Sequence, residues 1–161
     1  MCRSEALVKI AAKHEPHTAL VADILTLPHP PSSFDFAISI AVVHHLSTTT
    51  RRVQAIATIL ETLRLAPGSS GKALIYVWAL EQQQSRRGWS EKDEQDVMVP
   101  WVMKGASDVD TKTFHRYYHL YRSGELERDI TAAGGTVLEA GYEKDNWWAI
   151  ATKESDNTLH G

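Results

Sequence analysis

The feature that most constrains the fold is an apolar run at residues 34–46, which ends in two adjacent histidines, His44 and His45. Prolines and serines precede the run, and Ser47 and three threonines follow it, so turn-forming residues enclose a segment of strand length. β-Branched and aromatic residues fill the run without polar alternation, which predicts a strand buried on both faces in a parallel sheet. Because ligands in such sheets bind beyond the carboxyl ends of the strands, we expect chemistry at residues 42–46.

Length and composition limit the class of protein. The chain has 161 residues, 43% of them hydrophobic, which predicts one domain at residues 1–154 and a frayed polar tail at 155–161. A net charge of −3 disfavours a protein that coats nucleic acid through its overall charge, but leaves room for a local basic patch. The single cysteine, Cys2, excludes an internal disulfide framework and favours a cytoplasmic or nuclear location. Neither a membrane span nor a secretory signal is apparent.

Helical and strand patterns alternate along the chain. The periodicity predicts helices at residues 4–13, 51–64 and 123–133, and further strands at 17–24, 72–79, 136–142 and 146–152. The last two strands are separated by only three residues and are expected to form an antiparallel hairpin. This order predicts an α/β fold with a doubly wound sheet.

Two segments admit more than one interpretation. Residues 85–113 lose periodicity and gain charge; a loop of this length is either functional or a flexible insertion, and the embedded Trp101 indicates that part of it packs. Residues 114–122 are dense in aromatic and cationic side chains. This mixture suits stacking against bases or binding an anion, but a tyrosine-rich helix packed on the sheet would have a similar composition.

Asp23 and the adjacent histidines His44 and His45 are candidate binding residues from the sequence alone. Asp23 ends the predicted strand at 17–24, where it can cap the following turn or face a ligand. A metal site at His44 and His45 is disfavoured, because adjacent strand residues point to opposite faces and no third ligand is suitably spaced. We therefore predict no metal.

Several short motifs occur in an order that resembles one family of enzymes. They are Val21-Ala22-Asp23, Leu27-Pro28, Phe34-Asp35-Phe36, His44-His45-Leu46, Pro67-Gly68 and the terminal hairpin after Gly134-Gly135. Together they resemble class I S-adenosylmethionine-dependent methyltransferases. The resemblance implies a Rossmann-like doubly wound sheet with a C-terminal antiparallel hairpin, and S-adenosylmethionine as the cofactor.

Longer motifs narrow the resemblance to a subgroup. They are IYVWALEQ at residues 75–82, SRR at 85–87, QDVMVPW at 95–101, RYYHLYR at 116–122 and GYEKDNWW at 141–148. They look like the eukaryotic enzymes that methyl-esterify carboxymethyluridine at the tRNA wobble position, a domain also found fused to AlkB-like hydroxylases. The resemblance extends to Lys153 and implies two partners: tRNA, and a small zinc-binding activator protein. We expect the activator at the edge strand formed by residues 17–22.

The front of the chain departs from the family pattern. Members of this family begin with a strand, a glycine-rich loop, a helix and a second strand that ends in a ribose-binding acid. No GxGxG occurs in this sequence, and Arg3 lies beside the position where the acid is expected. We therefore expect an N-terminally truncated domain without the first two strands and the glycine-rich loop, and weak binding of the cofactor.

The resemblance also implies roles for individual residues. Asp23 would accept a hydrogen bond from the adenine amino group. The other residues implied at the cofactor are Ile24, Ala41, Val42 and His44. The substrate carboxylate is already ionised and needs no general base, so the predicted catalytic residues are orienting groups. They are Arg116, Arg122 and Tyr118. The residues implied in binding the tRNA substrate are Arg86, Arg87 and Trp78.

Two alternatives from other functional classes remain open. A small-molecule O-methyltransferase would be favoured if residues 116–122 were buried core. A non-catalytic module that binds tRNA or a partner protein is supported by the missing glycine-rich loop. The cofactor affinity and the exposure of residues 116–122 separate these alternatives.

Overall fold

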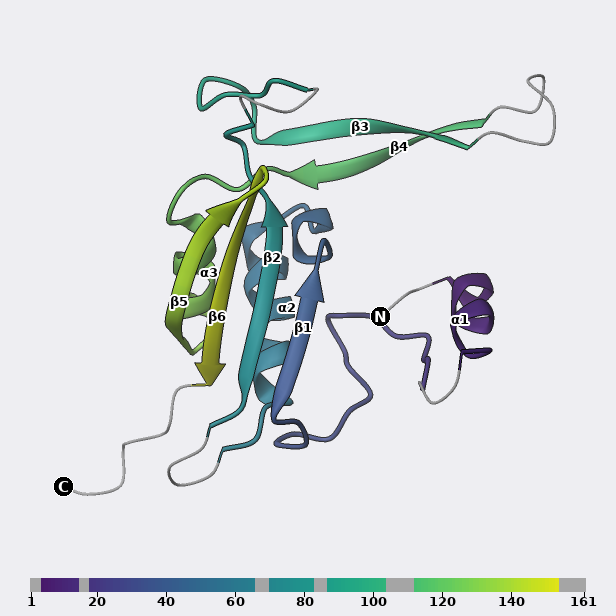
Figure 1. The fold of residues 1–161 in the computed structure, drawn as a ribbon, viewed down its shortest axis with the longest axis vertical. Coiled ribbons are helices and arrows are strands. Elements are labelled where there is room, and N and C mark those ends of the chain that lie inside the picture. The colour runs from purple at the N-terminus through teal and green to yellow at the C-terminus, as the bar shows by residue number, and fades with distance from the viewer. Residues whose placement is uncertain (1–3, 15–17, 66–69, 83–86, 104–111, 154–161) are drawn as a thin grey trace.

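The main body is a four-stranded mixed sheet with two helices on one face (Figure 1). The computed structural model describes residues 4–14, 18–65, 70–82, 87–103 and 112–153. In spatial order the strands are β1 (Phe36–Ile40), β2 (Lys72–Trp78), β6 (Asn146–Lys153) and β5 (Gly135–Glu143). β1 and β2 are parallel, whereas β6 runs antiparallel to β2 and to β5. The remaining elements of the body are α2 (Thr49–Glu61), α3 (Glu125–Ala132) and the 3-10 turn η1 (Val43–His45).

The core lies between the helices and the sheet. Thr48 caps α2 by accepting a hydrogen bond from the Arg51 backbone N–H at 3.3 Å, as expected for a threonine N-cap. The buried face of α2 includes Ile56 and Leu60, and alternate residues of β2 such as Ile75 are fully buried against it. The predicted amphipathic helix and the predicted strand at 72–79 are confirmed.

The carboxyl-terminal hairpin is also confirmed. β5 and β6 pair through a two-residue turn at Lys144 and Asp145, with φ values of 48° and 63°. Positive φ at both central residues is the geometry of a type I′ turn, whose twist matches that of antiparallel strands. The helix predicted at 4–13 forms α1 (Glu5–Ala11), and none of its residues is buried.

Two predictions about the front of the sheet are wrong. β1 is not buried on both faces, since Phe36, Ile38 and Ile40 are 53%, 60% and 55% exposed. The reason is that α2 and α3 lie on the same face, and no described element covers the other face of β1 (Figure 1). Residues 18–24 form no strand ladder, only isolated bridges such as that between Asp23 and Thr26. β1 is therefore the edge of the described sheet, and the edge strand assigned to residues 17–22 does not exist over its described part.

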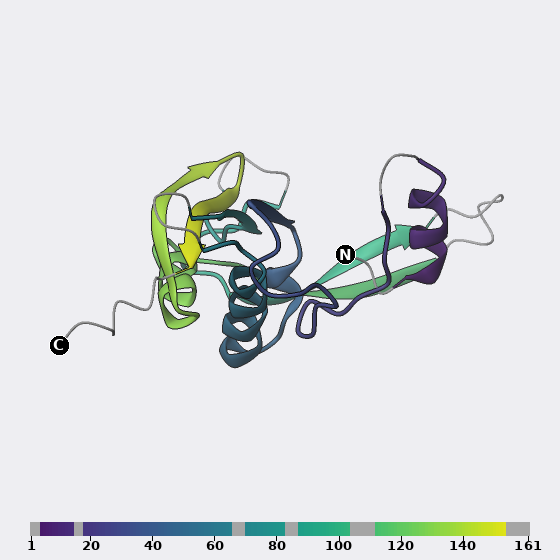
Figure 2. The ribbon, with the colours of Figure 1, turned by 90° about the horizontal axis from the view of Figure 1, so that it is seen from below.

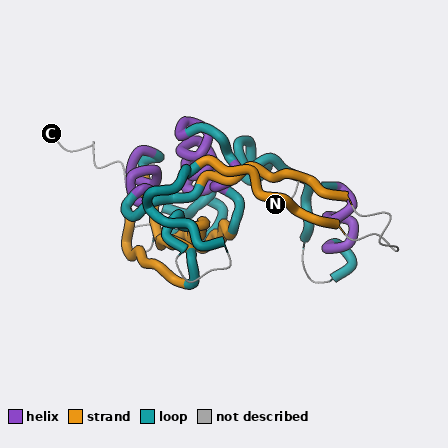
Figure 3. The backbone as a smooth tube through the Cα atoms, turned by 90° about the horizontal axis from the view of Figure 1, so that it is seen from above, coloured by secondary structure: helices purple, strands orange, loops and turns teal. Residues whose placement is uncertain are grey.

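The long segment without periodicity contains a second sheet. β3 (Asp96–Met103) pairs antiparallel with β4 (Lys112–His119) in a two-stranded ribbon that projects from the end of the main sheet (Figures 1, 2 and 3). The tyrosine-rich helix considered for residues 114–122 is therefore wrong. Pro100 obscured β3 in the sequence, but both strands of such a ribbon are edge strands, where proline is tolerated. Residues 104–111 and the predicted tail at 155–161 lie outside the described residues, and the domain boundary at 154 stays a prediction.

Candidate functional site

An aromatic cluster lies where the carboxyl ends of β1 and β2 meet the ribbon. The rings of Trp78 and Tyr118 stack with centroids 4.4 Å apart and planes 21° apart. The His44 ring lies 5.0 Å from that of Tyr118, so β2, β4 and η1 each contribute a ring. Ala41, which precedes η1, has φ of 57°. Left-handed backbone at a non-glycine residue is strained, and such strain concentrates at functional sites.

His44 is a neutral hydrogen-bond donor in this cluster. Burial, together with His45 and His119, lowers the pKa of His44 to about 3. The Trp78 backbone N–H donates to His44 Nδ1 at 3.0 Å, so the single imidazole proton is on Nε2. Nε2 is buried and has no hydrogen-bond partner among the described residues. An unpaired buried donor is costly, and an acceptor on a bound molecule would relieve that cost.

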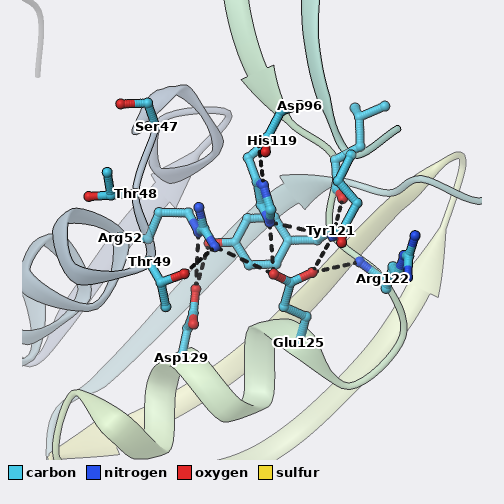
Figure 4. Close-up of polar contacts among 12 residues, drawn as sticks. Ser47, Thr48, Thr49, Arg52, Asp96, His119, Tyr121, Arg122, Glu125 and Asp129 are labelled. Carbon is cyan, nitrogen blue, oxygen red and sulfur yellow. Dashed lines mark hydrogen bonds and ion pairs between the residues drawn. The ribbon is translucent and has the colours of Figure 1, made fainter. Parts of the chain in front are cut away.

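A buried ionic network lies beside the cluster (Figure 4). Its centre is Arg52 of α2, which is 3% exposed. The guanidinium donates to Asp129 and Glu125 of α3, each at 3.4 Å, and to Thr49 at 3.0 Å. The Tyr121 hydroxyl donates to the same Asp129 carboxylate at 3.0 Å. The network therefore links α2 to α3 through charge-assisted hydrogen bonds.

His119 extends this network into the ribbon. Its Nδ1 lies 2.8 Å from Asp96 and its Nε2 lies 2.7 Å from Glu125. Burial would lower the pKa of His119, but hydrogen bonds to the two carboxylates raise it above its ordinary value. Burial likewise opposes ionisation of Glu125, but hydrogen bonds from His119, the Arg122 backbone and Gln95 lower its pKa to about 2. An imidazolium between two carboxylates thus holds the base of the ribbon on α3.

We expect this network to give the protein a pH-dependent stability. Glu125, whose pKa is lowered, stabilises the fold above its ordinary pKa of 4.5 and loses that contribution as the pH falls towards 2. His119, whose pKa is raised, contributes fully below its ordinary value of 6.5 and loses its contribution as the pH rises through the raised pKa. Urea denaturation across this range should therefore show the largest contribution between the two ordinary values.

A glutamine substitution isolates the histidine. His119→Gln removes the titrating group, so the decline in unfolding free energy above pH 6.5 should become shallower than in the wild-type protein. The matched control is His29→Gln, which changes a histidine outside this network. An unchanged alkaline decline in His119→Gln would mean that the imidazolium is not what stabilises the ribbon base.

Two hollows flank the sheet. One, of about 180 Å³, lies beside β1 and is mainly apolar, with Ile24, Phe36 and Val42 in its wall. The other, of about 680 Å³, lies at the β5–β6 turn, and its lining includes Glu81, Glu91 and Asp145 against one cation, Lys144. The acidic lining disfavours an anionic ligand in the second hollow.

The residues implied at the cofactor do not lie in one place: some line the hollow beside β1, and His44 lies in the aromatic cluster. Ile24 and Val42 line the hollow beside β1, whereas His44 lies in the aromatic cluster. Asp23 Oδ1 accepts a hydrogen bond from the Leu25 backbone N–H at 3.1 Å, so Asp23 caps its own turn. Ala41 is exposed at the end of β1. Their roles at a cofactor stay predictions.

The residues assigned to catalysis and tRNA lie along the ribbon and at its base. Tyr118 and Trp78 meet in the stacked pair, and the Arg116 guanidinium lies 4.1 Å from the centre of the Trp101 ring. Arg87 packs over Trp89 at 5.3 Å. The predicted residue Arg122 is exposed at the start of the turn before α3, whereas Arg86 lies outside the described residues. Of residues 116–122, Arg116 and Arg122 are exposed, whereas Tyr118, His119, Leu120 and Tyr121 are buried. The condition that favoured the small-molecule alternative is therefore met by the middle of the segment and not by its two arginines.

Sequence reasoning missed the partners of these residues. Trp101 was noted as a packing residue but not as the platform for Arg116, because that contact depends on the pairing of β3 with β4. Arg52 did carry a signal, since it lies four residues before Ile56 on the apolar face of α2. A charged residue on such a face requires buried partners.

Two features of the described residues bear on other functional classes. Within the described residues, no group of three or more histidine, cysteine, aspartate or glutamate side chains is placed to hold one metal ion. Among the helices formed by these residues, none combines the length and apolarity needed to cross a membrane.

Comparisons with a family model and with solved structures identify the fold. Residues 1–64 match the family model described as a methyltransferase domain. The CcbJ methyltransferase from Streptomyces caelestis superposes with a TM-score of 0.69 at 12% identity, covering 94% of this chain and 77% of that one. An S-adenosylmethionine-dependent methyltransferase from Clostridium acetobutylicum gives 0.67 at 9% identity, covering 94% and 70%. These likenesses confirm the class I methyltransferase fold.

Sequence relatives are closer. The tRNA (carboxymethyluridine(34)-5-O)-methyltransferase of Schizosaccharomyces pombe is 46% identical, over 94% of this chain and 70% of the relative. The Saccharomyces cerevisiae enzyme of the same name is 40% identical, over 94% of this chain and 74% of the relative. With this identity over most of both chains, the protein belongs to the tRNA (carboxymethyluridine(34)-5-O)-methyltransferase family.

Proposed function

We propose that this protein methylates the carboxymethyl group of the wobble uridine in tRNA, with S-adenosylmethionine as the methyl donor. The observation that carries the proposal is the 46% identity to the S. pombe tRNA methyltransferase over 94% of this chain. The product would be a methyl ester. The exposed rings and cation of the ribbon, Trp101, Phe114 and Arg116, suit a nucleic-acid substrate.

The hollow beside β1 suits the base of the cofactor. Its volume is about 180 Å³, and an apolar cavity of about 150 Å³ admits a benzene-sized ring. Ile24 and Val42 would pack on the faces of the adenine, and the adjacent Asp23 carboxylate would accept a hydrogen bond from its amino group. The nearby Ser39 hydroxyl is buried and without a hydrogen-bond partner in the described structure, so a polar edge of the bound group would satisfy it.

The chemistry needs orientation rather than proton transfer. Bound S-adenosylmethionine would supply an electrophilic methyl group to a carboxylate oxygen of the substrate, with the S–C bond breaking as the O–C bond forms and with no proton to remove. Arg116 and Arg122 would orient the carboxylate or an adjacent phosphate through charge-assisted hydrogen bonds. Tyr118, which is buried against Trp78, His44 and His45, would hold the wall of the site and not stack on the uridine itself. The neutral His44 Nε2–H would donate to an acceptor on a bound molecule without adding charge.

We also propose a protein partner and a location. The family resemblance implies a small zinc-binding activator protein, and the open edge of β1 would support strand addition. Phe36, Ile38 and Ile40 are exposed on the face of β1 that the helices do not cover, so a partner that pairs with the edge and also extends over this face would cover them. We propose the cytoplasm as the main location, with the nucleus as a second one.

Methyl transfer to defined RNAs tests the function. The protein, with and without the activator, is incubated with S-adenosylmethionine labelled in the methyl group and with tRNA anticodon stem–loops. One stem–loop carries 5-carboxymethyluridine at position 34, and its control carries unmodified uridine. We expect label only in the carboxymethyl substrate, as an ester that mild base removes.

Three outcomes would contradict the proposal. Base-stable label would indicate transfer to another atom. Label in a free carboxymethyl nucleoside, with none in the stem–loop, would identify a small-molecule methyltransferase. Tight stem–loop binding without transfer in either condition would identify a binding module.

A further inference from the structure

One face of the projecting ribbon carries apolar, aromatic and cationic side chains. The register places Val97 opposite Tyr118, Val99 opposite Arg116, Trp101 opposite Phe114 and Met103 opposite Lys112. Directly opposed residues share a face, and alternate residues along a strand do so as well. These eight residues therefore form one face, which we call the aromatic face, and it contains no acidic residue.

The outer part of the aromatic face is open to solvent. Trp101 is 42% exposed and Phe114 is also exposed, with ring centroids 6.5 Å apart. The Arg116 guanidinium lies 4.1 Å from the Trp101 centroid. A guanidinium packed on a ring keeps edge N–H groups available for an anion while its planar face is held by the ring.

The inner part of the same face reaches the candidate site. Tyr118 stacks on Trp78, and Val99 belongs to a buried cluster against which Trp89 packs. Trp89 carries Arg87 over its ring, so a second arginine–tryptophan pair adjoins the inner part. The face therefore runs from the carboxyl end of β2 outward along the ribbon (Figures 1 and 2).

We propose that the aromatic face binds unpaired nucleotides of the RNA that flank the nucleotide to be methylated. This inference rests on the proposed function. Bases would stack on Trp101 and Phe114, while Arg116 and Lys112 would contact phosphates. Single-stranded nucleic acid is bound by this combination of aromatic platforms and cations, because every base has a stackable face.

The charge of the face favours RNA over a protein partner. The centre of a protein interface is depleted of charged residues, whereas Arg116 lies at the centre of this face, over Trp101. The opposite face of the ribbon carries Met98, Val102 and the acidic Asp96. Substitutions on this opposite face therefore serve as controls for substitutions on the aromatic face.

Binding of two RNAs to matched variants tests the proposal. Fluorescence anisotropy would measure the dissociation constants for an anticodon stem–loop and for a fully paired duplex of equal length. Trp101→Ala should weaken stem–loop binding about tenfold to a hundredfold, as loss of a stacking platform does, and should change duplex binding little. Trp101→Phe should restore most of the affinity. Val102→Ala, at a residue of similar exposure (52%) on the opposite face, should bind both RNAs as the wild-type protein does.

The cation contacts have a separate readout. Lys112→Ala should reduce the slope of log affinity against log salt for the stem–loop by about 0.7, the value for one phosphate contact on a single strand. Thr113→Ala, one position along on the opposite face, should leave the slope unchanged. Circular dichroism of each variant would establish that the fold is retained.

The outcomes separate this inference from the proposed function. Methyl transfer to the stem–loop by the wild-type protein, with unchanged stem–loop affinity in Trp101→Ala, would overturn the ribbon proposal alone. A Trp101-dependent preference for the stem–loop, with no methyl transfer, would support the ribbon proposal and contradict the function. If Trp101→Ala weakened duplex and stem–loop binding equally, the ribbon proposal would also be overturned, because equal losses would indicate binding by charge without stacking.

Discussion

Replacing Arg52 by methionine is expected to lower the free energy of unfolding by about 3–5 kcal/mol, the cost of breaking a buried ion pair from one side. Methionine keeps an unbranched apolar stem but is shorter than arginine, and the substitution leaves the carboxylates of Asp129 and Glu125 without their buried cation. Burial already raises the pKa of Asp129 above its ordinary value, and loss of Arg52 would raise it further. The variant should therefore be closest to wild type at low pH, where protonation removes the uncompensated charge.

Urea denaturation of matched variants would measure this effect. Arg51→Met changes the neighbouring exposed arginine of α2 and should cost well under about 1 kcal/mol, as for most surface substitutions. The double variant Arg52→Met, Asp129→Leu removes the Arg52–Asp129 pair and leaves Glu125 paired with His119. It should recover a large part of the loss, because a packed apolar pair can replace a buried ion pair. Equal costs for Arg51→Met and Arg52→Met would show that the network does not stabilise the fold.

The parts of the fold that follow from local rules could be predicted from sequence. The threonine cap and the spacing of Ile56 and Leu60 define α2 without reference to the rest of the chain. The β5–β6 hairpin follows from two β-rich segments and a short polar turn at Lys144 and Asp145. In both cases the stabilising contacts are close in sequence, so the sequence pattern is sufficient to predict the element.

The errors concern burial, which depends on distant elements. Phe36, Ile38 and Ile40 predict a strand, and the strand forms, but the alternation of their exposure depends on which faces the helices cover. The apolar residues at 18–22 have strand composition, yet composition does not supply a neighbouring strand with which to pair. β3 was missed because, among the described strands, it pairs with β4 alone, and a two-stranded ribbon has no core-facing periodicity along most of its length.

The candidate site was also predicted in part: its residues were identified, but not their contacts. The motif RYYHLYR marked residues 116–122 as functional, but their alternation on β4 separates them. Tyr118 joins Trp78 and His44, whereas His119 points to Glu125 in a network that stabilises the fold. That separation requires knowing that the segment is a strand. The contact of Arg116 with Trp101 further requires the register of β3 against β4.

Alanine at Arg116 or Arg122 is expected to lower kcat/KM for methyl transfer to the carboxymethyl stem–loop. Loss of one charge-assisted hydrogen bond costs about 1.5–3 kcal/mol, or roughly tenfold to a hundredfold in rate. The affinity for S-adenosylmethionine should change little, because neither residue lines the hollow proposed for the cofactor. Arg116→Ala should mainly raise KM if Arg116 contacts a flanking phosphate, and should mainly lower kcat if Arg116 orients the carboxylate.

A distant arginine provides the control for charge. Arg64 is exposed and pairs with Asp35 at 2.6 Å, near the amino end of β1 and away from the aromatic cluster. Arg64→Ala removes the same charge from the protein as Arg116→Ala does, so it should leave both kinetic constants close to wild type. Steady-state kinetics and calorimetric titration of the cofactor on all three variants would decide the matter. A parallel loss of cofactor affinity in Arg116→Ala or Arg122→Ala would place that residue at the cofactor. Full activity in both variants would show that neither arginine orients the substrate.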